Sequence, residues 1–403
     1  MSTSLLYHAF GLPGYKYLNT GYVGGRVIFS ITQDPETFRC AACGSRAVHP
    51  RGKKARRFKA VPIGRKPVEV YFRVPRVSCE DCGKIRQVKI PFADARRTYT
   101  KVFERYVLEL CRCTTIQDAA RHLNVGWDLV KEIVKENLQR RFARPRLKHL
   151  RRIAIDEIAV RKGHRYVTIV LDLDSGAVVF VGDGKGGEAL APFWKRLHRS
   201  RAQVEAVAMD MSSAYHLAVS THLPWATIVF DHFHVVKLLN DKLSWLRRQL
   251  YQNAKENERA VLKGSRWLLL KNPEHLDTDR NEHQRLQAAL ALNQPLATAY
   301  YMKEDLRQLW SQPTRGIAEE ILDDWIARAE ASRIPILQRF ADTLDRHREG
   351  ILAYYDFPIS TGPLEGANNK IKTMKRQAYG FRDHEFFKLK ILGLHETKYA
   401  LTG

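Results

Sequence analysis

The fold is decided by IAIDEIAV at residues 153–160, YVTIVLDL at 166–173 and VVFV at 178–181. Each segment is short and rich in β-branched and other apolar residues, which is typical of largely buried strands. Asp174-Ser-Gly176 separates the last two segments and suits a tight turn. We therefore expect a meander of three antiparallel strands.

The segments that follow extend this sheet. Apolar residues recur at helical spacing over 188–199, and two more strand-like segments, 204–209 and 226–230, end directly before Asp210 and Asp231. The order strand-strand-strand-helix-strand-helix-strand is typical of an RNase H-like mixed sheet. We expect this α/β core to begin near residue 151.

Carboxylates at the strand ends are the candidate catalytic groups. Asp156 and Glu157 are adjacent, so a strand sends them to opposite faces and only one can line a given site. Asp172 and Asp174 lie near a hairpin turn, where acidic residues commonly serve local hydrogen bonds. Asp210 instead follows a buried strand. Carboxylate oxygens are hard ligands that hold Mg²⁺, the ion that phosphodiester cleavage uses, so Asp156 and Asp210 are the preferred candidates.

Two Cys-x-x-Cys-Gly motifs, at Cys40, Cys43 and at Cys79, Cys82, predict a metal site. Four thiolates complete a tetrahedral zinc shell and leave no position for water, so we expect Zn²⁺ to be structural. The strand-like segment 67–77 lies between the motifs and predicts a zinc ribbon. The alternative, four unrelated buried cysteines, is disfavoured by the repeated spacing.

A formal charge of +24 and a pI near 9.9 favour a polyanionic partner, with nucleic acid ahead of an anionic membrane. A solvated basic surface is the alternative. No apolar run approaches the roughly 20 residues that span a bilayer. We expect a cytoplasmic, nucleoid-associated protein that does not bind membranes.

A helix-turn-helix is predicted after the zinc motifs. Helical spacing begins at Lys101, Thr115-Ile-Gln-Asp118 has the spacing of a capping box, and 127–140 is a longer helix after a turn at 124–126. Short helical hairpins also occur in proteins that do not bind DNA, but here the neighbouring zinc ribbon and the positive net charge of the chain favour DNA binding. The expected DNA contacts in this region are Arg121, Trp127, Lys131 and Lys135.

The strand pattern disappears between residues 240 and 355, where 242–260, 295–309 and 317–348 have helical spacing. This predicts a helical insertion in the core. Its Trp245 and Trp267 are candidates for stacking on an unpaired base, although tryptophans on helices are more often core residues.

A chain of 403 residues exceeds one compact core of ordinary size. We expect a multidomain α/β protein with five successive parts: a zinc-ribbon domain with an N-terminal extension (1–95), a helix-turn-helix domain with a basic linker (96–150), the first part of the RNase H-like core (151–240), an all-α insertion (241–355) and the last part of the core (356–403).

Several of these segments together resemble a known family. They are Ile155-Asp-Glu-Ile158, Asp210-Met-Ser-Ser-Ala-Tyr215, Asp231-His-Phe-His-Val235 and Ser360-Thr-Gly-Pro-Leu-Glu-Gly-Ala-Asn368. In this order, after a zinc ribbon and a helix-turn-helix, they resemble the DDE transposases of bacterial insertion sequences, and within these the ISL-three group. The resemblance implies a metal-binding catalytic triad of Asp156, Asp210 and Glu365, with Asp231 and His234 as accessory residues beside the site.

Glu365 depends on this resemblance more than the two aspartates do. Pro363 and Glu365 also fit the first turn of a helix, where a carboxylate offsets the helix dipole without any catalytic role. Lys372 and Arg376 follow Glu365 at helical spacing, so we expect them to contact DNA phosphates.

The resemblance implies cleavage at the ends of a mobile element and transfer of the freed 3′-hydroxyl to target DNA. Two Mg²⁺ ions, with Mn²⁺ able to substitute, would serve both steps. The partners implied are double-stranded DNA, at terminal inverted repeats and at the target, and a second copy of the chain in an active homodimer. The rivals are a catalytically silent DNA-binding regulator and an RNase H-like nuclease that does not join strands.

Overall fold

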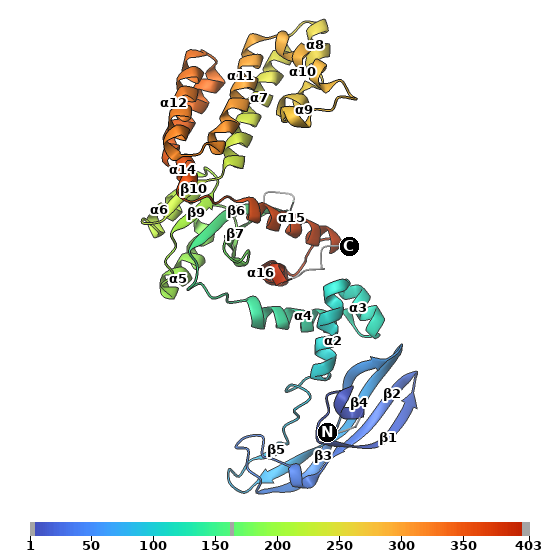
Figure 1. The fold of residues 1–403 in the computed structure, drawn as a ribbon. Coiled ribbons are helices and arrows are strands. Elements are labelled where there is room, and N and C mark those ends of the chain that lie inside the picture. The colour runs from blue at the N-terminus through green and yellow to red at the C-terminus, as the bar shows by residue number, and fades with distance from the viewer. Residues whose placement is uncertain (1–4, 162–164, 397–403) are drawn as a thin grey trace. The chain divides into compact units, whose positions relative to one another are not determined.

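The computed structural model describes residues 5–161 and 165–396. The chain divides into two compact units (Figure 1). Unit 1 comprises residues 1–143, 374–389 and 396–403, and unit 2 comprises 144–373 and 390–395. No helix of the described residues is both long and apolar enough to cross a membrane.

Unit 1 is built on a five-stranded sheet in the order β1-β2-β4-β3, with β5 also paired to β4. The strands are β1 (Tyr15–Val23), β2 (Arg26–Gln33), β3 (Val48–Ile63), β4 (Lys66–Cys79) and β5 (Ile85–Gln87). β4 confirms the strand expected at 67–77, whereas β1 and β2 show that the N-terminal extension belongs to the same sheet. β2 and β4 are parallel and the other pairs are antiparallel.

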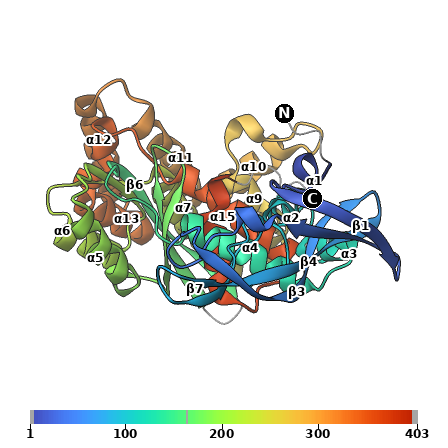
Figure 2. The same ribbon diagram turned by 90° about the horizontal axis from the view of Figure 1, so that it is seen from below.

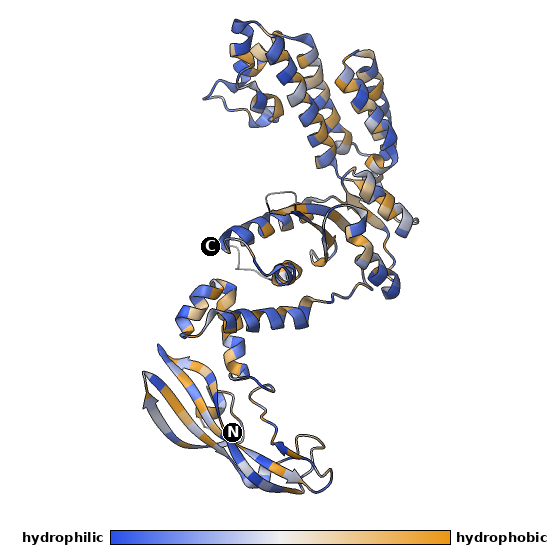
Figure 3. Cartoon of the chain, turned by 180° about the vertical axis from the view of Figure 1, so that it is seen from behind, coloured by the Kyte–Doolittle hydropathy of each residue, from blue (hydrophilic) through white to orange (hydrophobic). Residues whose placement is uncertain are grey.

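One face of this sheet forms a core with the short α1 (Leu5–His8) and the segment after β5. Phe58, Val70 and Phe72 are fully buried in it. Figure 3 shows hydrophobic and hydrophilic positions alternating along the strands, as expected for a sheet with one buried face.

The helix-turn-helix follows as α2 (Lys101–Cys113), α3 (Ile116–Leu123) and α4 (Trp127–Phe142). Thr115 begins α3, where its hydroxyl oxygen accepts from the Asp118 N–H at 3.1 Å, so the expected cap is present. Asn124 ends α3 in the left-handed conformation, with φ of 51°, and makes the tight turn into α4.

Unit 2 contains a mixed sheet in the order β10-β9-β6-β7-β8. Its strands are β6 (Arg152–Arg161), β7 (Arg165–Asp172), β8 (Val178–Asp183), β9 (Ala206–Met209) and β10 (Thr227–Phe230). β6, β7 and β8 form the expected antiparallel meander, while β9 and β10 continue the sheet in parallel from β6. Helices α5 (Ala191–Ser200) and α6 (Ser213–His222) connect the strands, which confirms the RNase H-like order.

Helices then replace strands up to residue 355 (Figures 1 and 2). They are α7 (His232–Asn253), α8 (Glu256–Leu262), α9 (Ser265–Leu270), α10 (Glu282–Ala291), α11 (Gln294–Arg307), α12 (Arg315–Ala331), α13 (Pro335–Arg346) and α14 (Arg348–Leu352).

The helix bounds differ from the expected ones in two places. α7 begins at His232, directly after Asp231, whose side chain caps it, and therefore ten residues before the expected start at 242. The helix expected over 317–348 is interrupted, because Arg333 has φ of 53° and Pro335 lacks the N–H that a continuous helix requires. The last helices, α15 (Gly362–Gln377) and α16 (His384–Leu392), each contribute residues to both units.

Candidate active site and zinc site

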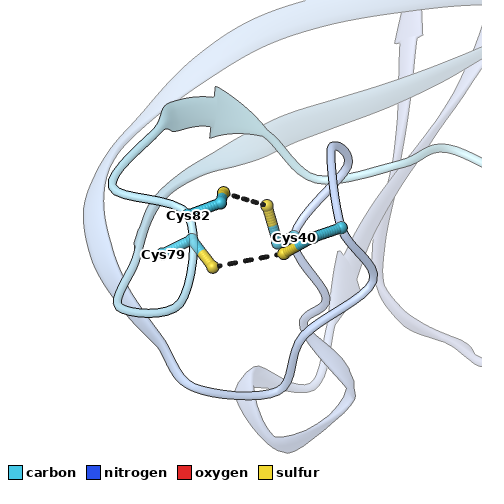
Figure 4. A group of neighbouring side chains, drawn as sticks. Cys40, Cys79 and Cys82 are labelled. Carbon is cyan, nitrogen blue, oxygen red and sulfur yellow. Dashed lines mark hydrogen bonds between the residues drawn. The ribbon is translucent and has the colours of Figure 1, made fainter.

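The four cysteines of the two motifs gather at one end of the first sheet (Figure 4). The sulfur atoms all lie within 4.8 Å of one another, with 3.6 Å between Cys40 and Cys82 and 3.5 Å between Cys43 and Cys79. Zinc–sulfur bonds of about 2.3 Å in a tetrahedron separate the sulfurs by about 3.8 Å, so the cluster fits zinc.

Backbone geometry supports this cluster. Gly44 and Gly83 follow the second cysteine of each motif with positive φ of 81° and 66°, a conformation that costs glycine little. Hydrogen bonds from the backbone N–H groups of Cys43 and Ala42 lower the pKa of the Cys40 thiol to about 6. Cys40 therefore favours a thiolate, the form that binds metal, whereas at Cys43 the Ser45 backbone N–H is outweighed by the neighbouring thiols and by burial, which raise the pKa of that thiol.

Asp156 and Asp210 lie at equivalent places on neighbouring strands. Ala154 of β6 pairs with Ala208 of β9 in parallel register, and each aspartate follows two residues later. Because side chains alternate along a strand, the two carboxylates extend from the same face, just beyond the last residues at which β6 and β9 pair. Both are half-buried, and the Asp210 carboxylate also accepts a hydrogen bond from the Ser212 N–H at 3.0 Å.

The environment of Asp156 disfavours its negative charge. Burial raises the pKa of Asp156 to about 6; the Glu157 N–H and the charge of His234 oppose this rise, whereas the Asp210 carboxylate adds to it. A nearby cation would relieve both burial and repulsion, so two oxygen donors in this setting fit a divalent metal.

Glu157 lies on the opposite face from Asp156, as adjacent positions on a strand require. It pairs in register with Thr168, and the Thr168 hydroxyl lies 2.9 Å from that of Tyr215. Burial, with a smaller contribution from Glu157, raises the pKa of Tyr215. Glu157 therefore belongs to the packing behind the site.

Glu365 is exposed in the first turn of α15. Among the described residues, Asp156, Asp210 and Glu365 do not form a group with all ligand oxygens within 4.8 Å. The link between α15 and the sheet is Asn368, whose side-chain amide donates to Asp156 Oδ2 at 2.9 Å. Asn368 is buried one turn after Glu365, so its contact holds the Glu365 helix against the strand that carries Asp156.

The sequence motif contained Asn368 without indicating its role. Its spacing of three residues from Glu365 is the signal that places both on one side of a helix. Leu364 and Ile371, four residues before and three residues after Asn368, are buried, so Asn368 lies at the edge of the apolar side of α15, next to the side that carries Glu365.

Asp231 connects the helical insertion to α15. Its carboxylate is 3% exposed, caps α7 by accepting from the Phe233 N–H at 3.3 Å, and accepts a hydrogen bond from the Thr361 hydroxyl. His234 follows in the first turn of α7, with its Nε2 4.0 Å from Asp231 Oδ2. Asp231 is thus held between two helix starts, while His234 lies near enough to Asp156 to lower the pKa of that carboxyl.

The candidate DNA-contacting residues differ in their surroundings. On α4, Trp127 is exposed, but Lys131 and Lys135 bind the Asp383 carboxylate at 2.9 and 3.1 Å. Arg121 of α3 is largely exposed, 3.8 Å from Asp118.

The remaining candidates are exposed on helices. Lys372 and Arg376 lie on the exposed side of α15. Trp245 on α7 and Trp267 on α9 are 41% and 65% exposed, and the Arg266 guanidinium covers one face of the Trp267 ring at 4.8 Å. Neither tryptophan is the buried core residue that tryptophans on helices usually are.

Comparison with known proteins gives matches along most of the chain. Residues 153–391 match a family described as "Transposase", residues 88–136 match the helix-turn-helix domain of transposase family ISL3, and residues 36–82 match the zinc-finger of transposase IS204/IS1001/IS1096/IS1165. The segments matched include the cysteine cluster, the helix-turn-helix and the mixed sheet with its carboxylates.

Whole proteins are similar over nearly their full length. The transposase for insertion sequence element IS1001 of Bordetella parapertussis is 35% identical, over 87% of this chain and 87% of that protein. The transposase for insertion sequence element IS1557 of Mycobacterium tuberculosis is 32% identical, over 89% of this chain and 86% of that protein. A solved structure, the Drosophila P element transposase strand transfer complex, has a TM-score of 0.34 at 12% identity over 67% of this chain and 82% of that chain, and nothing is concluded from so distant a likeness.

The three matched segments and the near full-length relatives agree with the geometry: a cysteine cluster that fits structural zinc, a DNA-binding helix-turn-helix, and a sheet with carboxylates on neighbouring strands. The chain belongs to the ISL3 family of DDE transposases.

Proposed function

We propose that this transposase binds the terminal inverted repeats of its insertion sequence, cleaves a phosphodiester at each end and joins the freed 3′-hydroxyl to target DNA. The observation that carries the proposal is the hydrogen bond from Asn368 to Asp156. It supports a single site in which Asp156 of β6 and Asp210, directly after β9, work with Glu365 on α15.

The three carboxylates would hold divalent metal, with Mg²⁺ the proposed ion. Two such ions supply a metal-activated water and stabilise the leaving oxygen of a displaced strand. Asp156 and Asp210 extend from one face of the sheet, so both carboxylates can bind the same pair of ions. Glu365 is exposed, whereas Asp156 and Asp210 are half-buried, so burial does not fix its side chain and it could turn toward them.

The surrounding residues position this set. Asn368 orients the Asp156 carboxylate and stabilises its ionised form, because its amide donates to Oδ2. Asp231 accepts a hydrogen bond from Thr361, directly before α15, and so fixes the position of the first turn of α15, where Glu365 lies. The charge of His234 favours the ionised carboxylate of Asp156, because it lowers the pKa of that group.

Joining two ends to one target requires two cleavage sites, so we propose a homodimer as the active complex. In it, Arg121 and Trp127 of the helix-turn-helix and Lys372 and Arg376 of α15 would contact DNA. Trp245 and Trp267 would stack on bases unpaired at the cut ends, since an exposed aromatic face is the requirement for such stacking.

The test uses duplexes with the element's ends and the variants Asp156→Asn, Asp210→Asn and Glu365→Gln. Each should bind the end duplex as the wild type does, yet give no strand cleavage in Mg²⁺. Asp174→Asn is the matched control, because it neutralises an exposed carboxylate of the same sheet, beyond the end of β7. Cleavage at the wild-type rate by any triad variant would remove that residue from the site.

Two further outcomes separate the rival functions. A wild-type protein that binds ends but never nicks them in Mg²⁺ or Mn²⁺ would be a regulator. Nicking without any joined product would indicate a nuclease. Joined products that require the 3′-hydroxyl at the nick support transposition.

A further inference from the structure

The basic side chains of α4 form ion pairs with carboxylates of the same chain. Lys131 and Lys135 both bind Asp383, and Lys135 also binds Glu385 at 2.6 Å. Their side chains are only 23% and 25% exposed. Asp383 is itself held in place by the Phe386 N–H, which donates to its carboxylate at 2.9 Å.

The end of α4 shows the same pattern. Arg140 binds Glu104 of α2 at 3.2 Å, and Arg141 binds Glu396. All four basic side chains of α4 therefore have acidic partners within unit 1. Contact with a DNA phosphate would require each to give up a carboxylate, so little net attraction for DNA remains on this helix.

In the sheet of unit 1, by contrast, basic side chains far outnumber acidic ones. Residues 44–90 contain fourteen Lys or Arg and only three Asp or Glu. Among the described ion pairs, the acidic residues of this stretch bind only Arg26, His49 and Arg57. Most of the basic side chains of β3 and β4 thus have no acidic partner in the part of the chain that the structure describes.

Strand register gathers several of these charges on one face. Arg57 pairs with Tyr71, Ala55 with Arg73, and Lys53 with Pro75. These positions alternate with the buried Val70 and Phe72, so they form the outer face of the sheet.

Lys53, Arg57 and Arg73 are exposed on this outer face, at successive rungs about 7 Å apart along the strands. We call Lys53, Arg57 and Arg73 the β3–β4 basic face. Glu69, nearly buried and bound to Arg26 and Arg57, is the acidic residue beside it. Glu69 lies 3.0 Å from Arg26 but 3.7 Å from Arg57, so Arg57 is held less closely than the basic side chains of α4, and one negative charge leaves the face positive.

We propose that the β3–β4 basic face docks on the phosphate backbone of duplex DNA, and that Lys131 and Lys135 of α4 hold unit 1 together rather than contacting DNA. The proposal rests on the proposed function, since the duplex is an element end or its flank. It separates two tasks: the sheet supplies affinity that is independent of sequence, and the exposed residues of the helix-turn-helix supply base contacts.

Charge complementarity identifies the partner. Each Lys or Arg placed against a phosphate of duplex DNA releases a condensed counterion, so the logarithm of the binding constant falls with the logarithm of salt concentration by about 0.9 per contact. Three contacts on the β3–β4 basic face should therefore account for about 2.7 of that slope.

The experiment measures binding of the full-length protein to end and scrambled duplexes across a salt series in magnesium-free buffer, where no strand is cut. The test variant combines Lys53→Gln, Arg57→Gln and Arg73→Gln, and the matched control combines Lys53→Arg, Arg57→Lys and Arg73→Lys. The test variant should lose about 2.7 from the slope equally on both duplexes. The control should keep the wild-type slope, and zinc content should stay at the wild-type value in both.

A second arm uses Lys131→Gln with Lys135→Gln, which should leave the slope unchanged while lowering the thermal unfolding temperature. An unchanged slope in the sheet variant, or a loss in the α4 variant as large as the predicted one, overturns the proposal. So does a sheet variant that loses binding to anionic vesicles or single-stranded RNA but keeps its slope on duplex DNA. Failure of the wild type to cleave ends would instead contradict the proposed function, and the salt slopes would still decide the role of the sheet.

Discussion

Replacing Asn368 by alanine removes the donor to Asp156 and is the most informative single change at the site. The bond is 2.9 Å long, its donor residue is buried, and its acceptor is a carboxylate whose pKa burial has already raised to about 6. A hydrogen bond to a charged group contributes about 1.5 kcal/mol or more, which corresponds to roughly one pKa unit and roughly tenfold in an equilibrium. The loss should therefore raise the pKa of Asp156 further above about 6.

The assay is single-turnover cleavage of an end duplex in Mg²⁺ between pH 5.5 and 9. Because metal binding requires the ionised carboxylate, the acidic limb of the rate profile should move up by about one unit in Asn368→Ala. The plateau at high pH should fall by about tenfold as α15 loses its tether. Asn368→Asp retains the size of the side chain but replaces the hydrogen-bond donor by an acceptor. The acidic limb of its rate profile should therefore not return to the wild-type pH. A uniform loss of rate with an unmoved acidic limb would refute the reasoning, because simple loss of packing predicts that result.

Three further changes test other parts of the structure. Cys79→Ser should lower zinc content and unfold the sheet of unit 1, measured by metal analysis and proteolysis; an intact, zinc-free sheet would contradict a structural metal. Thr115→Ala removes the cap of α3 and should destabilise the protein by about 1 kcal/mol in urea unfolding, whereas Thr115→Ser should be nearly neutral. In metal-free buffer, Asp156 binds a proton more tightly in the folded state than in the unfolded state, because its pKa is raised on folding. The Asp156 carboxyl therefore stabilises the fold at about pH 4, and this stabilisation is lost as pH rises through about 6. Thermal unfolding of Asp156→Asn should lack that dependence, and an unchanged pH dependence would contradict the raised pKa.

Local patterns predicted much of the fold. Alternation and apolar runs located the strands from β6 to β10, and capping and turn residues such as Thr115 and Asn124 located the helix-turn-helix. β1 and β2 were not predicted, although Gly24-Gly25 between them, both with positive φ, is a local signal for a hairpin; what no local pattern encodes is the parallel pairing of β2 with β4, about 40 residues later.

The candidate site was predictable where strand geometry determines it. Side-chain alternation separates Asp156 from Glu157, and the parallel pairing of β6 with β9 places Asp210 beside Asp156. The contacts that position α15 are different, because Asn368 and Asp156 are 212 residues apart and Thr361 and Asp231 are 130 apart. Lys135 meets Asp383 over 248 residues, which is why sequence reasoning assigned Lys135 to DNA without seeing its internal partner.

Substitution of a metal ligand tests the central claim, that Asp156 and Asp210 hold the divalent ions that cleave DNA. A thiolate is a soft ligand that binds Mg²⁺ poorly and Mn²⁺ better. Cleavage of an end duplex by Asp156→Cys, compared in the two ions, is the most direct measurement. We expect no cleavage in Mg²⁺ and partial recovery in Mn²⁺. Cleavage at the wild-type rate in Mg²⁺, or a loss that Mn²⁺ does not relieve, would contradict the claim.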